Sequence, residues 1–254
     1  MLRALLLLAP LCLMALEGPQ LAIPHTSAAP ALAAARSIGA PWDQAVLVPA
    51  LTQSPNPDRV MAESLPATEV RLLWDADALY IRFDCSDKNL YLPYNKHDDP
   101  LYKGDVVEVF LDARGDSQQW FEIQVAANNA TFDQNLLITT AAESDHEGKL
   151  LETILQRDFW LNLGYTMKGL RSAASVDDQG WTVEIAIPAQ AASRRLETKN
   201  WQLGQKLRLN LLRYDYNTPS GTETGDMLPM NWAPVRDGCP HISPQAMGQV
   251  VLAE

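Results

Sequence analysis

Acidic side chains are the first candidates for chemistry, because a pair of carboxylates can hydrolyse a glycosidic bond. Glu108, Glu122 and Glu184 each stand in a segment where polar and apolar residues alternate. On a regular strand face such residues usually meet solvent or pair with arginine, and catalysis further requires two of them at a defined separation. A glycoside hydrolase therefore stays an alternative that the sequence does not decide.

Other catalytic groupings are missing from the sequence. It contains no G-x-S-x-G nucleophile motif, no H-E-x-x-H zinc motif and no glycine-rich phosphate loop. His97, His146 and His241 stand in separate predicted loops without the spacing of metal ligands. The residue types thus favour binding over catalysis.

Aromatic side chains beside a polar strand face suit a sugar, which has apolar C–H faces and a rim of hydroxyl groups. The chain has seven tryptophans. Trp120, on the polar side of its segment, and Trp232, in a predicted loop, are candidates for exposure, whereas Trp181 has the parity of core residues. Tyr102 ends a polar loop directly before the strand-like segment 106–112.

The segments that must position these residues are short and alternate with period two. The clearest are residues 79–85, 119–125, 181–187 and 206–211. Turn-forming residues separate them, and strands do not alternate with helices. The pattern predicts an all-β fold, an antiparallel, jelly-roll-like β-sandwich with short helical insertions near 150–156 and 188–195.

Composition limits the class of partner. At 254 residues, of which 47% are hydrophobic, the chain can form one large β domain with a substantial core. The net charge of −11 argues against nucleic acid, because phosphate binding relies on lysine and arginine. The same charge disfavours adsorption to anionic membranes. We therefore expect a soluble protein with a neutral or cationic partner.

The N-terminus has the form of a secretory signal, in which one positive charge precedes the apolar run 4–16, too short to span a bilayer. We expect a signal peptide over residues 1–28, without a single indicated cleavage site, then an Ala/Pro-rich lead-in over 29–40 and one domain over 41–254. A short membrane anchor and a lipid on Cys12 are the alternatives. The expected location is secreted or periplasmic, with no membrane attachment after signal removal.

Two cysteines, Cys85 and Cys239, remain after that leader. Exported proteins commonly pair their cysteines, and a Cys85–Cys239 disulfide would stabilise the fold by about 2–4 kcal/mol. Alternatively, Cys85 is a buried free thiol, because it has the strand parity of Ile81 and Phe83. Both possibilities stay open at this point.

Sequence motifs in a fixed order resemble carbohydrate-binding module family 9 and its relatives in the DOMON-like superfamily. The motifs are L-W-D-A-D-A-L-Y-I-R-F-D-C-S-D, L-Y-K-G-D-V-V-E-V-F-L-D, W-F-E-I-Q-V, G-W-T-V-E-I-A-I-P, L-R-L-N-L-L-R-Y-D and a closing N-W-A-P…H-I-S-P-Q-A-M-G-Q-V-V-L. The resemblance covers about residues 41–252. It implies a non-catalytic β-sandwich that binds a polysaccharide or oligosaccharide, and a separate glycoside hydrolase as an expected partner.

The resemblance also implies where a sugar binds. Tyr102 and His241 stand where the founding members have two tryptophans that hold the sugar, and Trp232 could replace the second of these. Glutamine stands at position 124, where the family has an arginine. The expected partners of the sugar hydroxyls are Glu108, Gln124, Arg208 and Asn210.

Calcium and haem complete the expectations that follow from the resemblance. The family often carries structural calcium, for which loops 84–87 and 98–105 offer oxygen ligands, although the same residue types also form turns. A b-type haem redox domain is the alternative within the superfamily. The ligand types for haem are supplied by Met167, Met227, Met230, Met247 and His241.

Overall fold

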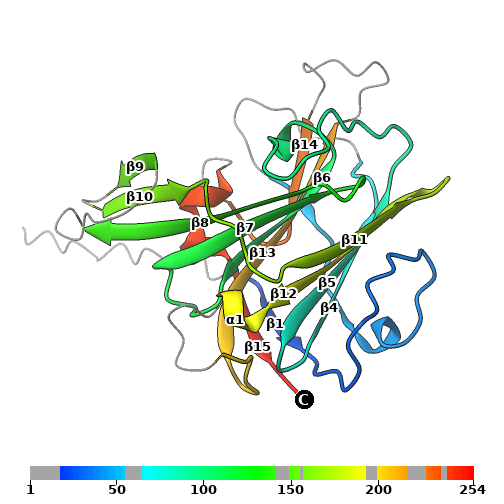
Figure 1. Ribbon diagram of the computed structural model, residues 1–254, viewed down its shortest axis with the longest axis horizontal. Helices are drawn as coiled ribbons and strands as arrows, with labels where there is room; N and C mark the ends of the chain where they lie inside the picture. The colour runs from blue at the N-terminus through cyan, green and yellow to red at the C-terminus, as the bar shows by residue number, and fades with distance from the viewer. Residues whose placement is uncertain are drawn as a thin grey trace, which may run out of the picture.

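Two β-sheets face each other in the computed structural model (Figure 1). It describes residues 18–54, 64–140, 149–154, 157–192, 199–216, 227–235 and 239–254. The larger sheet has, in spatial order, β1 (Gln20–Ile23), β15 (Gly248–Leu252), β13 (Lys206–Tyr216), β6 (Val106–Asp112), β7 (Gln119–Ala126), β8 (Thr131–Thr140), β10 (Arg157–Asn162) and β9 (Lys149–Ile154). Strand β14 (Met227–Asn231) also pairs with β13, and β3 (Thr52–Gln53) pairs with β14.

The smaller sheet has the order β11 (Arg171–Val176), β12 (Gly180–Pro188), β5 (Ala78–Ser86), β4 (Thr68–Trp74) and β2 (Val46–Leu47). The described helical pieces are η1 (Trp42–Gln44), η2 (Leu101–Lys103), α1 (Ala189–Ala192), η4 (Pro240–Ile242) and η5 (Pro244–Ala246). The named strands pair antiparallel except for β1 with β15, which are parallel. No helix among the described residues is long and apolar enough to cross a membrane.

The core lies between the two sheets, where the strands direct alternate side chains inward. On β12 these are Trp181, Val183, Ile185 and Ile187, all at 0% exposure. Odd-numbered residues of β6 and β7 face them from the larger sheet. Burying each large apolar side chain contributes about 1.5–3 kcal/mol. The predicted antiparallel β-sandwich is confirmed.

The outward face of the smaller sheet is covered rather than solvated. Arg82, 1% exposed, donates hydrogen bonds to Glu184 Oε1 at 2.7 Å and to the Ala35 carbonyl at 2.7 Å. The Ala34 amide donates to Glu184 Oε2 at 2.9 Å. The segment expected to be a lead-in over 29–40 therefore packs on the domain and satisfies polar groups of β5 and β12.

The N-terminal boundary also differs from the expectation. Strand β1 pairs with β15 over four residues, and Ile23 is a fully buried core residue. The expected boundary at residue 28 therefore lies C-terminal to β1, so that cleavage there would remove a strand of the sheet. Sequence could not show this, because Gln20–Ile23 is too short to carry a periodic pattern. Residues 1–17, which include most of the expected signal, lie outside the described residues.

One of the two expected helical insertions is wrong. Residues 149–154 form strand β9, which pairs with β10, while residues 155 and 156 lie outside the described part of the chain. The second expectation is confirmed by α1, Ala189–Ala192, and residues 193–195 lie outside the described part of the chain. A short apolar run does not distinguish a helix from a strand, and here pairing with β10 decides.

The two cysteines do not pair. Cys85 is 0% exposed in the core between the sheets, and Cys239 packs beside Ile242 and Met247 on the outward face of the larger sheet. The expected Cys85–Cys239 disulfide is therefore wrong for this structure, because the larger sheet separates the two thiols. The alternative of a buried, free Cys85 is the one observed.

Candidate functional site

Four polar side chains meet on the outward face of the larger sheet. Strand register places Glu108 of β6 opposite Gln124 of β7, and Glu122 of β7 opposite Gln134 of β8. Because all four positions are even-numbered, the pleat turns them to the same side, away from the intersheet core. Each is at most 3% exposed. We call these four residues, with Tyr214 and His241, the polar cluster.

The C-terminal loop brings His241 onto this face. Ile242 and Met247, 8% and 1% exposed, anchor the loop in an apolar cluster with Phe110 and other outward-facing residues of the larger sheet. Within the loop, the Ser243 hydroxyl donates to the Cys239 carbonyl at 2.9 Å. The His241 ring lies edge-on to Phe110, with 5.4 Å between ring centroids. The imidazole is therefore held directly over β6 and β7.

Glu122 is the centre of the hydrogen-bonded network. Its Oε2 lies 2.8 Å from His241 Nε2, and Gln134 Nε2 donates to the same oxygen. Gln124 Nε2 donates to Glu122 Oε1 at 2.6 Å. On the other side of the imidazole, His241 Nδ1 lies 3.8 Å from Cys239 Sγ. A carboxylate, an imidazole and a thiol thus follow one another in direct contact.

Burial and neighbouring charges separate the two glutamates. Burial, with the charge of Glu122, raises the pKa of Glu108 well above its usual value. Burial acts in the same direction on Glu122, but the charge and hydrogen bond of His241 outweigh it and lower the pKa of that carboxyl. At His241 burial acts to lower the pKa, but the charges and hydrogen bonds of Glu122 and Cys239 together outweigh it and raise the pKa of the imidazole. Burial therefore disfavours the charge on Glu108, while Glu122 and His241 form an ion pair.

Three buried oxygens in the polar cluster have no hydrogen-bond partner among the described residues. They are Glu108 Oε2, Gln124 Oε1 and Gln134 Oε1. Folded proteins leave few buried polar atoms unpaired, and each such atom costs about 1–3 kcal/mol. The two amide oxygens accept hydrogen bonds, and the Glu108 oxygen accepts or, when it carries the carboxyl proton, donates, so the three atoms on adjacent strands suit a ligand, or water, with several O–H groups.

Three of the seven residues expected to contact sugar come together here: Glu108, Gln124 and His241. Tyr102 lies on η2, just before β6, and is 47% exposed. Its neighbour Leu101 is buried, and the Tyr216 hydroxyl donates to the Tyr102 carbonyl at 2.9 Å. The backbone of Tyr102 is therefore fixed while its ring is open to solvent.

The remaining expected residues have other contacts. Asn210 is 2% exposed and donates to the Ala233 carbonyl at 3.1 Å, so it fixes a loop and offers little to a ligand. Trp232 is 6% exposed and packs against Gly248, where an added Cβ would lie 2.4 Å from the indole. Neither residue is placed to contact a sugar in this structure. The expectations for both are corrected.

Arg208 also lies apart from the polar cluster. In the strand register Arg208 lies opposite Asp112. Asp112 is four residues along β6 from Glu108, which separates Arg208 from Glu108 by about 13 Å along the strand. Its guanidinium donates to the carbonyls of Gly115 and Gln245 at 3.2 Å each. Arg208 lines an open groove of about 710 Å³ beside Lys206. It therefore does not contribute to the site around Glu108.

Sequence reasoning missed Gln134 and Tyr214, and it gave Glu122 and Cys239 roles other than binding. Glu122 was expected to be solvent-exposed or paired with arginine. The shared parity of Glu108, Glu122 and Gln124 was a usable signal, because adjacent hairpin strands turn such residues to one face. Nothing in the sequence indicated that the C-terminal loop would cover them. Trp120, a candidate for exposure, is fully buried under the same loop region.

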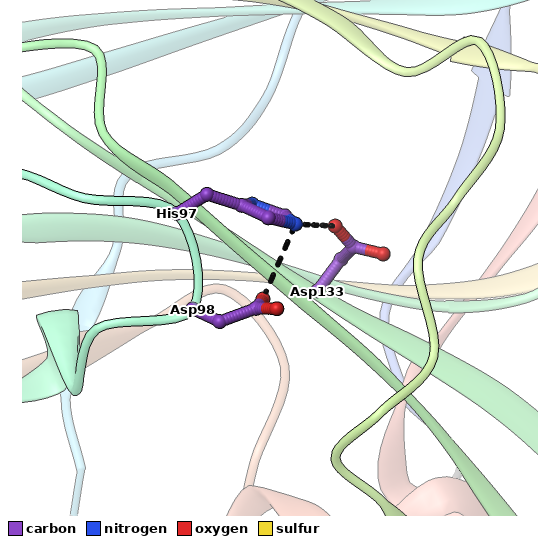
Figure 2. A group of neighbouring side chains, drawn as sticks. All are labelled: His97, Asp98 and Asp133. Atoms are coloured by element: carbon purple, nitrogen blue, oxygen red, sulfur yellow. Dashed lines mark ion pairs between the residues drawn. The ribbon is translucent and has the colours of Figure 1, made fainter.

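Two acidic groups bear on the calcium expectation. His97 Nε2 lies 3.4 Å from Asp98 Oδ1 and 4.0 Å from Asp133 Oδ1, as Figure 2 shows. The nearby Thr131 carbonyl accepts from His97 Nδ1 at 3.0 Å. Calcium prefers shells made entirely of oxygen ligands, so a set containing an imidazole nitrogen does not fit it.

The second acidic group consists of Asp87, Asp105 and Asp215. Arg213 already supplies the positive charge there, because its guanidinium lies 3.2 Å from Asp87 and 2.5 Å from Asp215. The Asp105 carboxylate accepts backbone hydrogen bonds from Tyr91 and Tyr216. One guanidinium thus serves two of the three carboxylates, and the third has backbone N–H donors, so calcium at this group stays a prediction.

Comparison with known proteins gives one family and several related folds. The family model described as "Carbohydrate family 9 binding domain-like" matches residues 38–254. A family 9 carbohydrate-binding module from Caldicellulosiruptor kristjanssonii, solved with cellotriose, has a TM-score of 0.60 at 16% identity, covering 92% of this chain and 93% of that one. The same kind of module from that organism with glucose has a TM-score of 0.58 at 16% identity, covering 91% and 95%.

A further similar structure is a candidate carbohydrate-binding protein from Bacteroides uniformis. Its TM-score is 0.63 at 11% identity, covering 93% of this chain and 100% of that one. At such identities these likenesses establish the fold. No match was found among curated proteins.

Proposed function

This chain belongs to the carbohydrate family 9 binding domain-like family, and on that premise we propose that it binds a saccharide at the polar cluster. The ligand class is a plant-type or other polysaccharide, or its oligosaccharides. Modules of similar fold were solved with cellotriose and glucose, so glucose-based chains are the first ligands to test. The binding would be non-catalytic.

The unpaired acceptors carry the proposal. Glu108 Oε2, Gln124 Oε1 and Gln134 Oε1 lie on three adjacent strands and are buried without partners. Hydroxyl groups of a sugar are donors that can satisfy them, and a buried acceptor gains more from that bond than an exposed one. A ligand would approach past Tyr214 and His241, which are only partly buried.

Aromatic surface borders the same end of the sheet. Tyr94, Phe132 and Tyr214 are half-buried and pack against a small apolar cluster that includes Leu101. The exposed ring of Tyr102 stands next to Leu101 on η2. Such rings can cover the C–H faces of a sugar while the cluster bonds its hydroxyls.

Calorimetry with glucose, cellotriose and xylo-oligosaccharides tests the proposal. The decisive variant is Glu108→Leu, which removes both acceptors but nearly keeps the side-chain volume. The Tyr214 hydroxyl loses its hydrogen-bond partner Glu108 in this variant, so we expect a loss of about 1–3 kcal/mol in stability, while the affinity of the folded variant falls about tenfold or more. Tyr102→Ala, at an exposed position, should weaken binding about fivefold through lost stacking.

Leu203→Ala is the matched surface control, since Leu203 is 58% exposed in a separate turn. It should bind like the wild type. The proposal fails if the wild type binds nothing in a broad glycan panel. It also fails if Glu108→Leu, folded, binds with unchanged affinity.

A glycoside hydrolase at the same cluster is the second candidate. The observation in its favour is the pair Glu108 and Glu122, whose pKa values are moved in opposite directions by burial, by mutual repulsion and by His241. Such separation is what an acid–base pair of carboxylates needs. Release of sugar from cello- or xylo-oligosaccharides by the wild type, abolished in Glu122→Gln, would establish it.

A haem site finds less support among the described residues. His241 has both ring nitrogens engaged, with Glu122 and Cys239. Met167 and Met230 are core residues at 2% and 1% exposure. Ligation through any of these would require breaking existing contacts.

Export belongs to the same proposal. It rests on the charged start and apolar run of the N-terminus, and on a binding role for polysaccharides that are too large to enter a cell. Expression of the full chain with fractionation should find a shortened protein in the periplasm or medium. Recovery of the uncleaved chain with the cytosolic fraction would contradict export.

A further inference from the structure

The C-terminal loop and β7 place a nucleophile, a base and an orienting group in succession: Cys239, His241 and Glu122. The thiol lies 3.8 Å from one imidazole nitrogen, and the other nitrogen lies 2.8 Å from the Glu122 carboxylate. A nucleophile, a base and a group that orients the base in direct succession are the common signature of thiol and hydroxyl activation. Sugar binding does not require the thiol.

The arrangement is held from both ends. The Ser243 hydroxyl bonds the Cys239 carbonyl, and buried Ile242 anchors the loop, so the thiol and the imidazole keep their separation. At the other end, Gln124 and Gln134 donate to the two oxygens of Glu122. Since both glutamines are almost fully buried, the carboxylate cannot easily turn away from His241.

The charges around the imidazole favour a thiolate. The described titratable groups facing it are Glu122 of β7, Glu108 of β6, Tyr214 of β13 and Cys239 of its own loop. Burial keeps Glu108 and Tyr214 neutral by raising the pKa of each. Glu122 stabilises the imidazolium, which then holds the pKa of the Cys239 thiol below its usual value although burial acts against this.

Two buried acceptors that lack partners in the described part of the chain lie near the imidazole that contacts the thiol. Glu108 Oε2 and Gln134 Oε1 are buried acceptors without hydrogen bonds among the described residues, and Gln134 lies 3.4 Å from His241. These atoms can accept N–H or O–H groups from whatever reaches Cys239, which is itself only partly buried. An ammonium group suits these acceptors best, because it carries three N–H donors and no acceptor.

We propose that Cys239 is a nucleophilic thiolate, activated by His241 and Glu122, and a site of covalent modification by small disulfides that carry an ammonium group. In the reaction the thiolate attacks one sulfur of R–S–S–R, a new S–S bond forms to Cys239, and the old S–S bond breaks. Its electron pair leaves on R–S⁻, which takes a proton from the His241 imidazolium or from water. No other oxidant is needed.

Alkylation of the full chain by iodoacetamide tests the thiolate, with peptide mass mapping to follow each cysteine. Below its pKa, an ordinary thiol alkylates about tenfold faster for each unit of pH. We expect the Cys239 rate to change by less than about threefold between pH 6 and 8. Cys85 is the internal control: it is fully buried, burial raises the pKa of its thiol to about 12, and it should not react.

His241→Gln and Glu122→Gln separate activation from mere exposure. At pH 6 the rate of Cys239 alkylation in each variant should be lower than in the wild type by a factor of about ten or more. At pH 9 the rates should converge. The wild-type profile decides the matter even if a variant fails to fold. A tenfold rise per pH unit in the wild type overturns the proposal.

The disulfide partner is tested with cystamine, which is cationic, and dithiodiglycolate, which is anionic. At pH 7 we measure the rate at which each reagent forms a mixed disulfide with Cys239. The ratio of the cystamine rate to the dithiodiglycolate rate should be about tenfold larger for the protein than for a free cysteine peptide. Equal ratios for protein and peptide would overturn the assignment of an ammonium group to the two buried acceptors near His241. Sugar affinity enters neither experiment, so failure here leaves the proposed function standing.

Discussion

At the scale of single residues, His241 and Glu122 predict how stability depends on pH. The pKa of His241 is raised on folding, so its contribution is present below about pH 6.5 and is lost as pH rises through the folded value. The pKa of Glu122 is lowered, so its contribution is present above about pH 4.3 and is lost as pH falls through the folded value. Both contributions are complete together between about pH 4.5 and 6.5.

His241→Gln should therefore lower the free energy of unfolding most within that window. Urea denaturation of the variant and wild type from pH 4 to 10 measures the difference, which we expect to shrink towards alkaline pH. A difference that grows with pH would contradict the ion pair.

Arg213 gives a second residue-scale prediction. Its side chain is 0% exposed, bonds Asp87 and Asp215, and stacks 5.6 Å from the centroid of a Trp181 ring. Arg213→Met leaves two buried carboxylates without their cation, which should cost about 3–5 kcal/mol in urea denaturation. The matched control is Arg114→Met, whose 41% exposed side chain pairs with Asp116 and should cost less than about 1 kcal/mol. Equal losses would show that the buried network contributes little.

The side of the sheet that each residue faces was predictable from the sequence, but its exposure was not. Parity correctly assigned Phe83 and Cys85 to the core, and it turned Glu108 and Gln124 to one face of adjacent strands. Exposure was not predictable, because alternation says which side a residue faces but not what covers that side. That is why Trp232 and Asn210 were expected at a surface and are buried.

At the scale of elements, the pieces with the clearest period-two alternation were the ones predicted. The alternating segments became β5, β7, β12 and β13, whereas short elements depended on partners that the sequence does not reveal. Strand β9 exists through pairing with β10, and β1 through pairing with β15. The terminal segments matter most here, because residues 24–36 cover the smaller sheet and 239–247 cover the larger one.

The placement of β1 predicts where an exported chain begins. Ile23 is fully buried, and an added Cβ on Gly18 would lie 2.3 Å from the Met247 carbonyl oxygen, so the chain is packed from residue 18 onward. We expect N-terminal sequencing of the exported protein to find a first residue at or before 18. A protein starting at residue 29 should be less stable in urea by about 2–5 kcal/mol for the loss of Ile23 alone. Equal stability of proteins starting at 18 and 29 would contradict the role of β1.

At the scale of the whole molecule, the larger sheet acts as a partition. Its inward face belongs to the core, and its outward face carries the polar cluster under the C-terminal loop. The two cysteines lie on opposite sides of this partition, so no bridge can link them without unfolding the sandwich. Stability should therefore come from packing and buried ion pairs, with no contribution from a cross-link.

Thermal unfolding with and without dithiothreitol tests this separation. We expect the midpoint to move by less than about 1 °C, and Cys239→Ser to unfold at the same midpoint in both conditions. A disulfide worth about 2–4 kcal/mol would instead lower the midpoint by about 4 °C or more on reduction. Such a drop, absent from Cys239→Ser, would mean that the thiol of the C-terminal loop does reach the core, and the partition by the larger sheet would then be wrong.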